Sequence, residues 1–436
     1  MDYRMKPMDA FALNLRLFDT QTTTTSAPGN DLTPEMKTYY HDRLGDNAEP
    51  NLVHDQFAQK CPIPKNGGKT IEFRRYSPLP KALNKLTEGV TPNGNKLNVT
   101  TLNATVEQYG DYIELSDILE TTAIDRNVEE ATKLLGSQAG RTLDTVTREV
   151  LAGGTNKLFA PKPTAGGGTT EVLLRKDVTT ECGLTLGVIR KAVATLKRMN
   201  AVPINGNYVM IIHTDVSSDL FGDKEWVDVH KYTNAENIYS GEIGRLYNVR
   251  FVETTEAKIV GPGAMLGIER YYRTKLNSAA ASSAVIYPED TFTVAQAAVV
   301  TAEIAAGSVY KLYVDGVEAT VASVTGGSAG LCKITLETPV TAAAGAMVCG
   351  IGAGKDGSAI YCSLLLADNA YGTTEISGMG LQHIVKQLGS GGTTDPINQR
   401  STTGWKATKV AERLVEEYML RIEHSSAGFG AKAESN

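Results

Sequence analysis

The stretch KTIEFRRYSPLPKALNKLTEGVTPNGNKLNVTTLNATVEQYGDYIEL, residues 69–115, is the part of the sequence that most constrains the fold. It follows Gly67-Gly68 and consists of two strand-like limbs around a centre rich in Gly, Pro and Asn at 87–96. Alternation in the return limb predicts a half-buried strand. The predicted apolar face carries Leu102, Ala104, Val106 and Tyr112, and the predicted polar face carries Thr101, Asn103, Glu107 and Asp111.

Such an arm cannot be stable by itself. At about 3.3 Å per residue each limb reaches roughly 40 Å. A lone two-stranded ribbon is marginal in water and leaves its edges unpaired. The sequence therefore predicts that something outside the arm's own domain covers it, and a neighbouring copy of the same chain is the simplest candidate.

A long amphipathic helix is predicted directly after the arm. Ser116 is the expected N-cap, and apolar residues then recur every three or four positions from Ile124 to Leu151. Gly153-Gly154 provides the stop. At 1.5 Å per residue the helix is about 40 Å long, and its single apolar stripe can lie across a sheet.

Composition bounds the class of protein. The 436 residues are 42% hydrophobic and 21% charged, which is typical of a globular chain with room for about three domains. The net charge of −6 argues against a surface that grips nucleic acid. The five cysteines are scattered and form no C-x-x-C, so neither a disulfide scaffold nor a zinc site is expected. We expect no signal peptide and no membrane-spanning segment.

Further elements are predicted along the chain. We expect helices at 184–200 and at 214–222, the second capped by Thr214 or Asp215, and a buried strand at 207–213. Residues 279–353 change to Ala, Val, Thr and Gly and carry Asp315-Gly316 between alternating limbs, a strong hairpin signal. We interpret 279–353 as an all-β insertion whose two ends lie close together in space.

The sequence contains motif-like patterns, but the elements predicted around them do not fit the corresponding functional sites. Gly352–Gly357 fits G-x-G-x-x-G, but a strand-like run follows it instead of a helix N-terminus. Gly326–Gly330 fits G-x-S-x-G and is also followed by a strand, so a hairpin tip is favoured over a nucleophile elbow. The six histidines show no metal-ligand spacing. We therefore expect no catalytic, cofactor-binding or metal-binding residue, no cofactor and no enzymatic activity.

Several segments together resemble a known family. They are the arm and helix, GEIGRLYNVRFVET (241–254), DNAYG (368–372), and LGSGGTTDPINQRSTTGWKATKVAERLVEEYMLRIEHS (388–425). In this order they resemble the tailed-bacteriophage major capsid proteins typified by that of coliphage N4, a branch of the phage Hong Kong 97 (HK97) fold. The resemblance covers nearly the whole chain outside 279–353.

The resemblance implies an α+β fold and a division of the chain. The implied parts are an N-terminal arm (1–50), a peripheral domain with a spine helix (51–66, 107–155 and 401–425), an extended β-hairpin loop (67–106), an axial domain (156–278 and 354–400), the β-rich insertion (279–353) and a C-terminal tail (426–436).

It also implies a function. The expected protein is a virion component that self-assembles into homohexamers and homopentamers of an icosahedral head, built in the host bacterial cytoplasm around double-stranded DNA that it does not bind by sequence. A separate scaffold, a portal and decoration proteins are the other expected partners, and no membrane is involved. An encapsulin-like nanocompartment shell of the same fold is the alternative.

Overall fold

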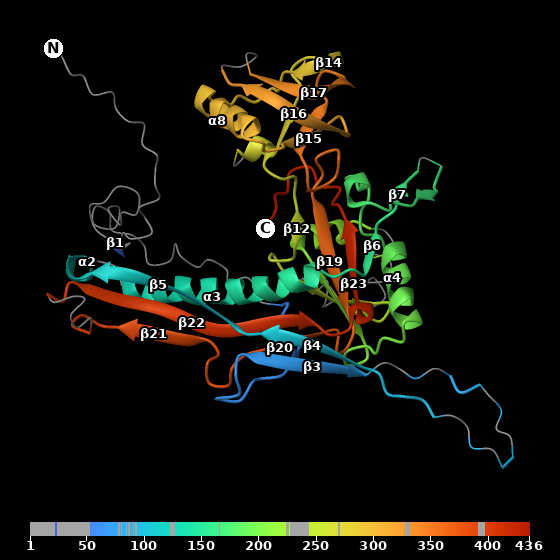
Figure 1. Cartoon of the computed structure of the whole chain (residues 1–436), viewed down its shortest axis with the longest axis vertical. Helices are drawn as coiled ribbons and strands as arrows, with labels where there is room; N and C mark the ends of the chain where they lie inside the picture. The colour runs from blue at the N-terminus through green and yellow to red at the C-terminus, as the bar shows by residue number, and fades with distance from the viewer. Residues whose placement is uncertain are drawn as a thin grey trace.

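The computed structural model describes residues 22–23, 53–76, 79, 81–83, 85, 88–89, 91, 94–122, 127–164, 166–223, 226, 244–268, 271–327, 332–390 and 397–436. Figure 1 shows three main bodies of β structure. One sheet lies along the long helix, a second sheet runs across the C-terminal end of that helix, and a third lies beyond the far end of the second. The mixed α+β architecture is the one that the family resemblance implies.

The first sheet, here called the peripheral sheet, is built on two long antiparallel strands. Strand β5 (Glu107–Ser116) pairs with β22 (Arg400–Arg413) along its whole length. The strand order is β1-β5-β22-β20-β2, and β21 also pairs with β22. The shorter strands are β1 (Thr22–Thr23), β2 (Gln59–Lys60), β20 (Tyr371–Thr374) and β21 (Gln382–Lys386).

The spine helix lies on one face of this sheet, as predicted. It comprises α2 (Asp117–Thr122) and α3 (Asn127–Ala152), and residues 123–126, which include the expected Ile124, lie outside the described ranges. The Ser116 hydroxyl accepts a hydrogen bond from the Leu119 N–H at 3.3 Å, which confirms the N-cap. The apolar stripe of α3 packs on Trp405 and Ala407 of β22.

The end of α3 is capped from the sheets. No basic residue stands in its last turn. Arg413 of β22 donates to the Val150 carbonyl at 2.6 Å, and Arg421 donates to the Ala152 carbonyl. Cations at a helix C-terminus satisfy its free carbonyls and its dipole. Both sheets are therefore tied to the same end of the helix.

The extended loop forms a two-stranded ribbon, but its strands are paired over seven residues each and are shorter than the predicted limbs. Strands β3 (Thr70–Tyr76) and β4 (Val99–Thr105) pair in register from Thr70↔Thr105 to Tyr76↔Val99. The predicted apolar face is wrong in one position, because Tyr112 is exposed while Ala104 and Val106 are buried. Val106 separates β4 from β5, and the side-chain phase changes there, so β5 turns Tyr109 and Ile113 toward the helix instead.

The second, axial sheet contains the most deeply buried strands. Its order is β10-β11-β9-β19-β23-β6, with β12 on β19. The strands are β6 (Lys157–Phe159), β9 (Tyr208–Ile212), β10 (Arg245–Leu246), β11 (Val249–Glu253), β12 (Ile259–Val260), β19 (Ile360–Leu366) and β23 (Met419–His424).

This sheet is covered on both faces. Helix α4 (Leu186–Arg198) contributes to the core that holds Met210, Ile212 and Leu365. The alternate residues of the same strands, among them Ile211, join a core with Leu151 of α3. Two covered faces explain why every residue of β9 and β19 is buried.

Three expectations for the axial region need correction. Strand β23 pairs with β19 and β6, so 419–424 leaves the peripheral sheet that was expected to hold 401–425. Conversely β20 and β21, expected in the axial part, pair with β22 in the peripheral sheet. Helix α5 (Thr214–Phe221) is capped by neither Thr214 nor Asp215. The ring of His213 accepts from the Asp215 N–H at 3.1 Å.

The third sheet has its own core and the order β13-β18-β15-β16-β17-β14. Asp315 and Gly316 both have positive φ and form the predicted hairpin turn. The strands are β13 (Arg273–Lys275), β14 (Ala280–Ile286), β15 (Lys311–Val314), β16 (Val317–Thr325), β17 (Lys333–Ala342) and β18 (Met347–Gly350).

The expectation of an all-β insertion is wrong in one respect, because α8 (Val294–Ala305) packs on this sheet. Its run VAQAAVVTAEIA is apolar almost throughout and shows little helical period. The available signal was the capping box of Thr293 and Gln296, which the structure shows to be formed. The chain enters this sheet through β13 and leaves through β18, which pair with each other, so entry and exit are adjacent but the inserted unit begins before the expected residue 279.

Candidate assembly surfaces

The two glycine motifs hold no catalytic arrangement. Gly352–Gly357 lies in the turn between β18 and β19, and no helix follows it. Gly326 follows β16, while Ser328 and Gly330 lie outside the described residues. Among the described residues, no group of three or more His, Cys, Asp or Glu side chains could hold a metal ion. Within the same ranges, no helix is both long and apolar enough to cross a membrane.

The described histidines have structural partners. His54 is fully buried and binds Asp144 of α3 through its backbone N–H (2.8 Å) and its ring Nδ1 (2.6 Å). His424 Nε2 lies 2.8 Å from the Ser363 hydroxyl, and burial lowers the pKa of His424 to about 4. Both members of this Ser–His pair are buried, so no substrate reaches them. His41 and His230 lie outside the described residues.

The extended loop is the first exposed surface of interest. Beyond Tyr76 and Val99 no strand pairing of its limbs is present in the described residues. Leu83 and Leu97 are 82% and 71% exposed, and Leu79 and Tyr76 are exposed as well. Aliphatic side chains at the end of an unpaired ribbon are costly to leave in water. This loop has the properties of a segment that another molecule covers.

The base of the loop is held by its own chain. The Phe73 ring lies against Gly372 of β20, where an added Cβ would be 3.3 Å from it. Arg75 forms an ion pair with Glu417 at 2.5 Å. These contacts fix the direction in which the ribbon leaves the peripheral sheet, so the distal part projects away from the body (Figure 1).

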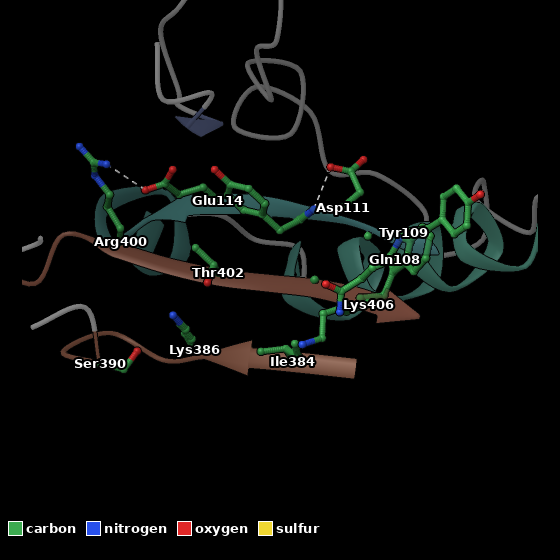
Figure 2. Close-up of a pocket in the computed structure, with 14 residues that line it drawn as sticks. Gln108, Tyr109, Asp111, Glu114, Ile384, Lys386, Ser390, Arg400, Thr402 and Lys406 are labelled. Carbon is green, nitrogen blue, oxygen red and sulfur yellow. Dashed lines mark hydrogen bonds and ion pairs between the residues drawn. The ribbon is translucent and has the colours of Figure 1, made fainter. Parts of the chain in front are cut away.

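A groove runs across the peripheral sheet on the face opposite α3. It has a volume of about 710 Å³ and is lined by β5, β22 and β21 (Figure 2). Gly110 and Gly404 form its floor, since a Cβ at either would come within 2.6–2.7 Å of the paired strand. Tyr112, 62% exposed, and Ile384 stand beside this floor.

Charges also line the groove. Glu114 is buried and forms an ion pair with Arg400 at 3.2 Å. Lys386 and Lys406 extend from β21 and β22 into the same space. A trough of this kind, with a glycine floor, one exposed aromatic ring and two lysines, suits an extended peptide segment better than a compact small molecule.

Strand β21 adds an open edge beside the groove. It pairs only with β22 in the described residues, and its exposed aliphatic side chains are Ile384 and Val385, with Leu381 and Leu388 at its ends. An exposed hydrophobic edge strand is a site for pairing with another chain. The sequence analysis missed both groove and edge, because the register that brings Gly404 beside Tyr112 and Ile384 is invisible before β5, β22 and β21 are paired. The apolar positions of LQHIVKQL (381–388) were the only signal.

A buried charge cluster holds strand β23 of the axial sheet in place. Glu423 of β23 accepts two hydrogen bonds of 2.7 Å from Arg175 and lies 2.8 Å from Arg421. Burial alone would raise the pKa of Glu423, but the Arg175 hydrogen bonds and the nearby positive charges hold it below its ordinary value. The carboxylate therefore stays ionised and anchors β23 to the segment before α4.

Comparison with known proteins agrees with this architecture. Residues 99–314 match the family model described as "Phage capsid protein". No curated protein matches the sequence.

Solved phage capsids share the fold at low sequence identity. The cyanophage P-SCSP1u capsid is 9% identical, with a TM-score of 0.53 over 89% of this chain and 93% of that chain. The cyanophage Pam1 capsid is 12% identical, with a TM-score of 0.50 over 97% of this chain and 100% of that chain. The mature capsid of bacteriophage PhiM1 is 11% identical, with a TM-score of 0.50 over 88% and 91%. At these identities the likeness concerns the fold, which is the HK97-like capsid fold.

The family match runs through the spine helix, the axial strands β6 and β9 to β12, and the start of the third sheet, and the capsid fold extends over nearly the whole chain. The chain is therefore similar to phage capsid proteins in sequence over 99–314 and in fold over nearly its whole length.

Proposed function

We propose that this chain is the major capsid protein of a tailed phage, of the N4-like branch, and that its hexamers and pentamers tile an icosahedral head around double-stranded DNA. One observation carries the proposal. The extended loop has the fixed base and the uncovered aliphatic end of a segment that is completed by another copy. In a closed shell every copy has a neighbour to provide that cover.

The proposal assigns each segment of the chain to a part of the capsid subunit. We assign 67–106 to the extended loop, the sheet of β5 and β22 with α3 to the peripheral domain, and the sheet of β9, β19 and β23 to the axial domain. The third sheet with α8 is the inserted domain. Residues 1–50 serve as an arm between copies, and within one chain β1 of this segment pairs with β5 at the edge of the peripheral sheet.

The groove and the β21 edge are the proposed receiving surfaces. Tyr112 and Ile384 provide apolar contact for an arriving strand, and Lys386 and Lys406 provide charge. The protein acts by geometry alone and has no enzymatic role. It encloses DNA without binding it tightly, since its net charge is −6.

The remaining partners and the location complete the proposal. The shell is assembled in the host cytoplasm on a separate scaffold and joins a portal, and decoration proteins add to its outer surface.

The decisive experiment shortens the loop without disturbing its base. Residues 77–98 are replaced by Asn-Gly, so that Tyr76 and Val99, which are already paired, are joined by a two-residue hairpin turn. The variant is expected to fold as the full chain does, by circular dichroism, and to form no closed particles by sedimentation and electron microscopy. Normal closed particles from this variant would contradict the proposal.

A matched control and a cargo analysis complete the test. Replacing 166–168, the tip between β7 (Lys162–Pro163) and β8 (Thr169–Thr170), with Asn-Gly shortens another exposed turn and is expected to leave assembly intact. The nanocompartment alternative shares the fold and differs in its contents. DNA inside particles purified from infected cells supports the phage head, whereas a packaged enzyme would support the alternative.

A further inference from the structure

The segment Ala427–Asn436 crosses three parts of the molecule that are far apart in sequence. The Ala427 N–H donates to Asp219 of α5 at 3.0 Å, and the Gly430 carbonyl accepts from the Ala359 N–H before β19 at 2.7 Å. Arg273 of β13, at the root of the third sheet, donates to the carbonyls of Ala431 and Ala433. The segment thus connects the axial sheet to the entrance of the inserted domain.

Its last residues occupy a built site beside β12 and α3. The Asn436 side chain pairs with the backbone on both sides, accepting from the Ile259 N–H at 2.9 Å and donating to the Ala257 carbonyl at 2.8 Å. The Ser435 hydroxyl accepts from the Gly261 N–H at 2.8 Å. Three groups of one short stretch, 257–261, are therefore satisfied by two side chains of this segment.

Two cations complete the site. Arg148 of α3 and Lys258 each donate to the Asn436 carbonyl at 3.1 Å. The Arg148 side chain is 4% exposed, and it also donates to the Glu256 carbonyl at 3.0 Å. Glu149 forms an ion pair with each of the two cations, at 2.7 Å from Arg148 and 2.8 Å from Lys258. Arg148 of the spine helix and Lys258, the residue before β12, thus donate to the same carbonyl oxygen.

At Gly261 the backbone of the C-terminal segment lies too close for any side chain to fit between them. A Cβ added to Gly261 would meet the Ser435 nitrogen at 2.8 Å and the Glu434 carbonyl carbon at 3.1 Å. The absence of a side chain at 261 is therefore what lets the segment lie directly on the strand.

We infer that Ala427–Asn436 is a strap bound in a peptide-binding site of Arg148, Lys258, Ile259, Gly261 and Arg273, and that the bound strap fixes the spine helix and the inserted domain against the axial sheet before copies assemble. The second half of this inference rests on the proposed function, since the angle between spine helix and axial sheet enters the curvature of a shell. The first half does not depend on assembly.

Hydrogen exchange on the unassembled full chain tests the first half. Ser435→Ala with Asn436→Ala removes the acceptors of the Ile259 and Gly261 amides, and both amides are expected to exchange about five- to tenfold faster. The control is Lys432→Ala, which alters an exposed side chain of the same segment. Unchanged exchange at Ile259 and Gly261 in the first variant would overturn the strap.

A second variant attacks the site from the opposite side. Gly261→Ala leaves the strap sequence intact and is expected to release it, giving the same increase in exchange at Ile259. Gly183→Ala, where an added Cβ meets nothing within 4 Å, is the matched control. No increase in Gly261→Ala would contradict the site.

Particle size tests the second half. The strap variants are expected to give a broader or shifted distribution of particle diameters than the full chain by electron microscopy. Faster exchange with an unchanged distribution would overturn the claim that the strap sets shell geometry. If the unaltered chain itself forms no shell, the proposed function falls, while the exchange result still decides the strap.

Discussion

The axial and peripheral sheets differ in how far their two faces are covered. Strands β9 and β19 are buried at every position, because α4 covers one face of the axial sheet and the C-terminal end of α3 helps to cover the other. In the part of the chain that the structure describes, the peripheral sheet is covered by α3 on one face, and its other face carries the groove beside the open β21 edge. In the described residues the axial sheet is covered within one chain, while the peripheral sheet leaves a face exposed that, under the proposed function, other copies cover.

The largest expected effect lies in the axial charge cluster. Glu423→Gln leaves Arg175 and Arg421 without their shared carboxylate and is expected to lower the free energy of unfolding by about 3–5 kcal/mol in urea titration. Glu171→Gln, which breaks the exposed pair with Lys191, is the control, with an expected change of at most about 1 kcal/mol. Equal effects would mean that the two environments do not differ as described.

Replacing a buried leucine of the axial sheet and an exposed leucine of the loop by alanine compares the two regions for apolar burial. Leu365→Ala in β19, fully buried, is expected to cost about 2–5 kcal/mol of unfolding free energy. Leu83→Ala in the loop is expected to change the unfolding free energy by less than about 0.5 kcal/mol, while it weakens assembly. A large loss of stability of the unassembled chain in Leu83→Ala would show that the loop is already buried in one copy.

The pH dependence of stability should come mainly from the axial part. His424 is held neutral with its pKa lowered to about 4, whereas an unfolded histidine titrates near 6.5. The unfolded state therefore binds more protons below pH 6.5, so stability is full above that pH and falls as the pH drops toward 4, by up to about 3 kcal/mol. Urea midpoints at pH 7.0, 6.0 and 5.0 measure the fall.

His424→Gln is the control for this titration. Glutamine keeps a polar partner for Ser363 but does not titrate, so the fall between pH 7.0 and 5.0 is expected to become shallower. An identical fall in the variant would assign the pH dependence to other groups.

The smallest expected effect concerns the groove. Tyr112→Ala removes an exposed ring and is expected to leave the unfolding free energy of one copy unchanged within about 0.5 kcal/mol. If the groove receives another copy, the same change raises the protein concentration needed for assembly. Tyr247→Ala, an exposed tyrosine far from the groove in sequence, is the control for the loss of an aromatic surface.

The same contrast explains what the sequence could and could not predict. The helices α3 and α4, the Ser116 cap and strand β9 follow from local periodicity and capping, and the structure confirms them. Helix α8 was missed because an apolar run carries no period, and the exposed Tyr112 was missed because the phase of a strand can change at one residue such as Val106.

The assembly surfaces and the strap depend on pairing between distant segments. Nothing in the local sequence of 400–425 indicates that β22 and β23 separate into two sheets. Likewise nothing near Asn436 indicates that its amide completes the edge of β12. Such features become visible only when the strands are in register.

Electron cryomicroscopy of the full chain, expressed with its scaffold, tests the central claim most directly. We expect closed shells in which density for the distal part of the loop, 77–98, lies on a neighbouring copy, while the base of the loop and the axial sheet keep the contacts seen in one chain. Shells in which this loop folds back on its own copy and leaves the neighbour's groove empty would contradict the account.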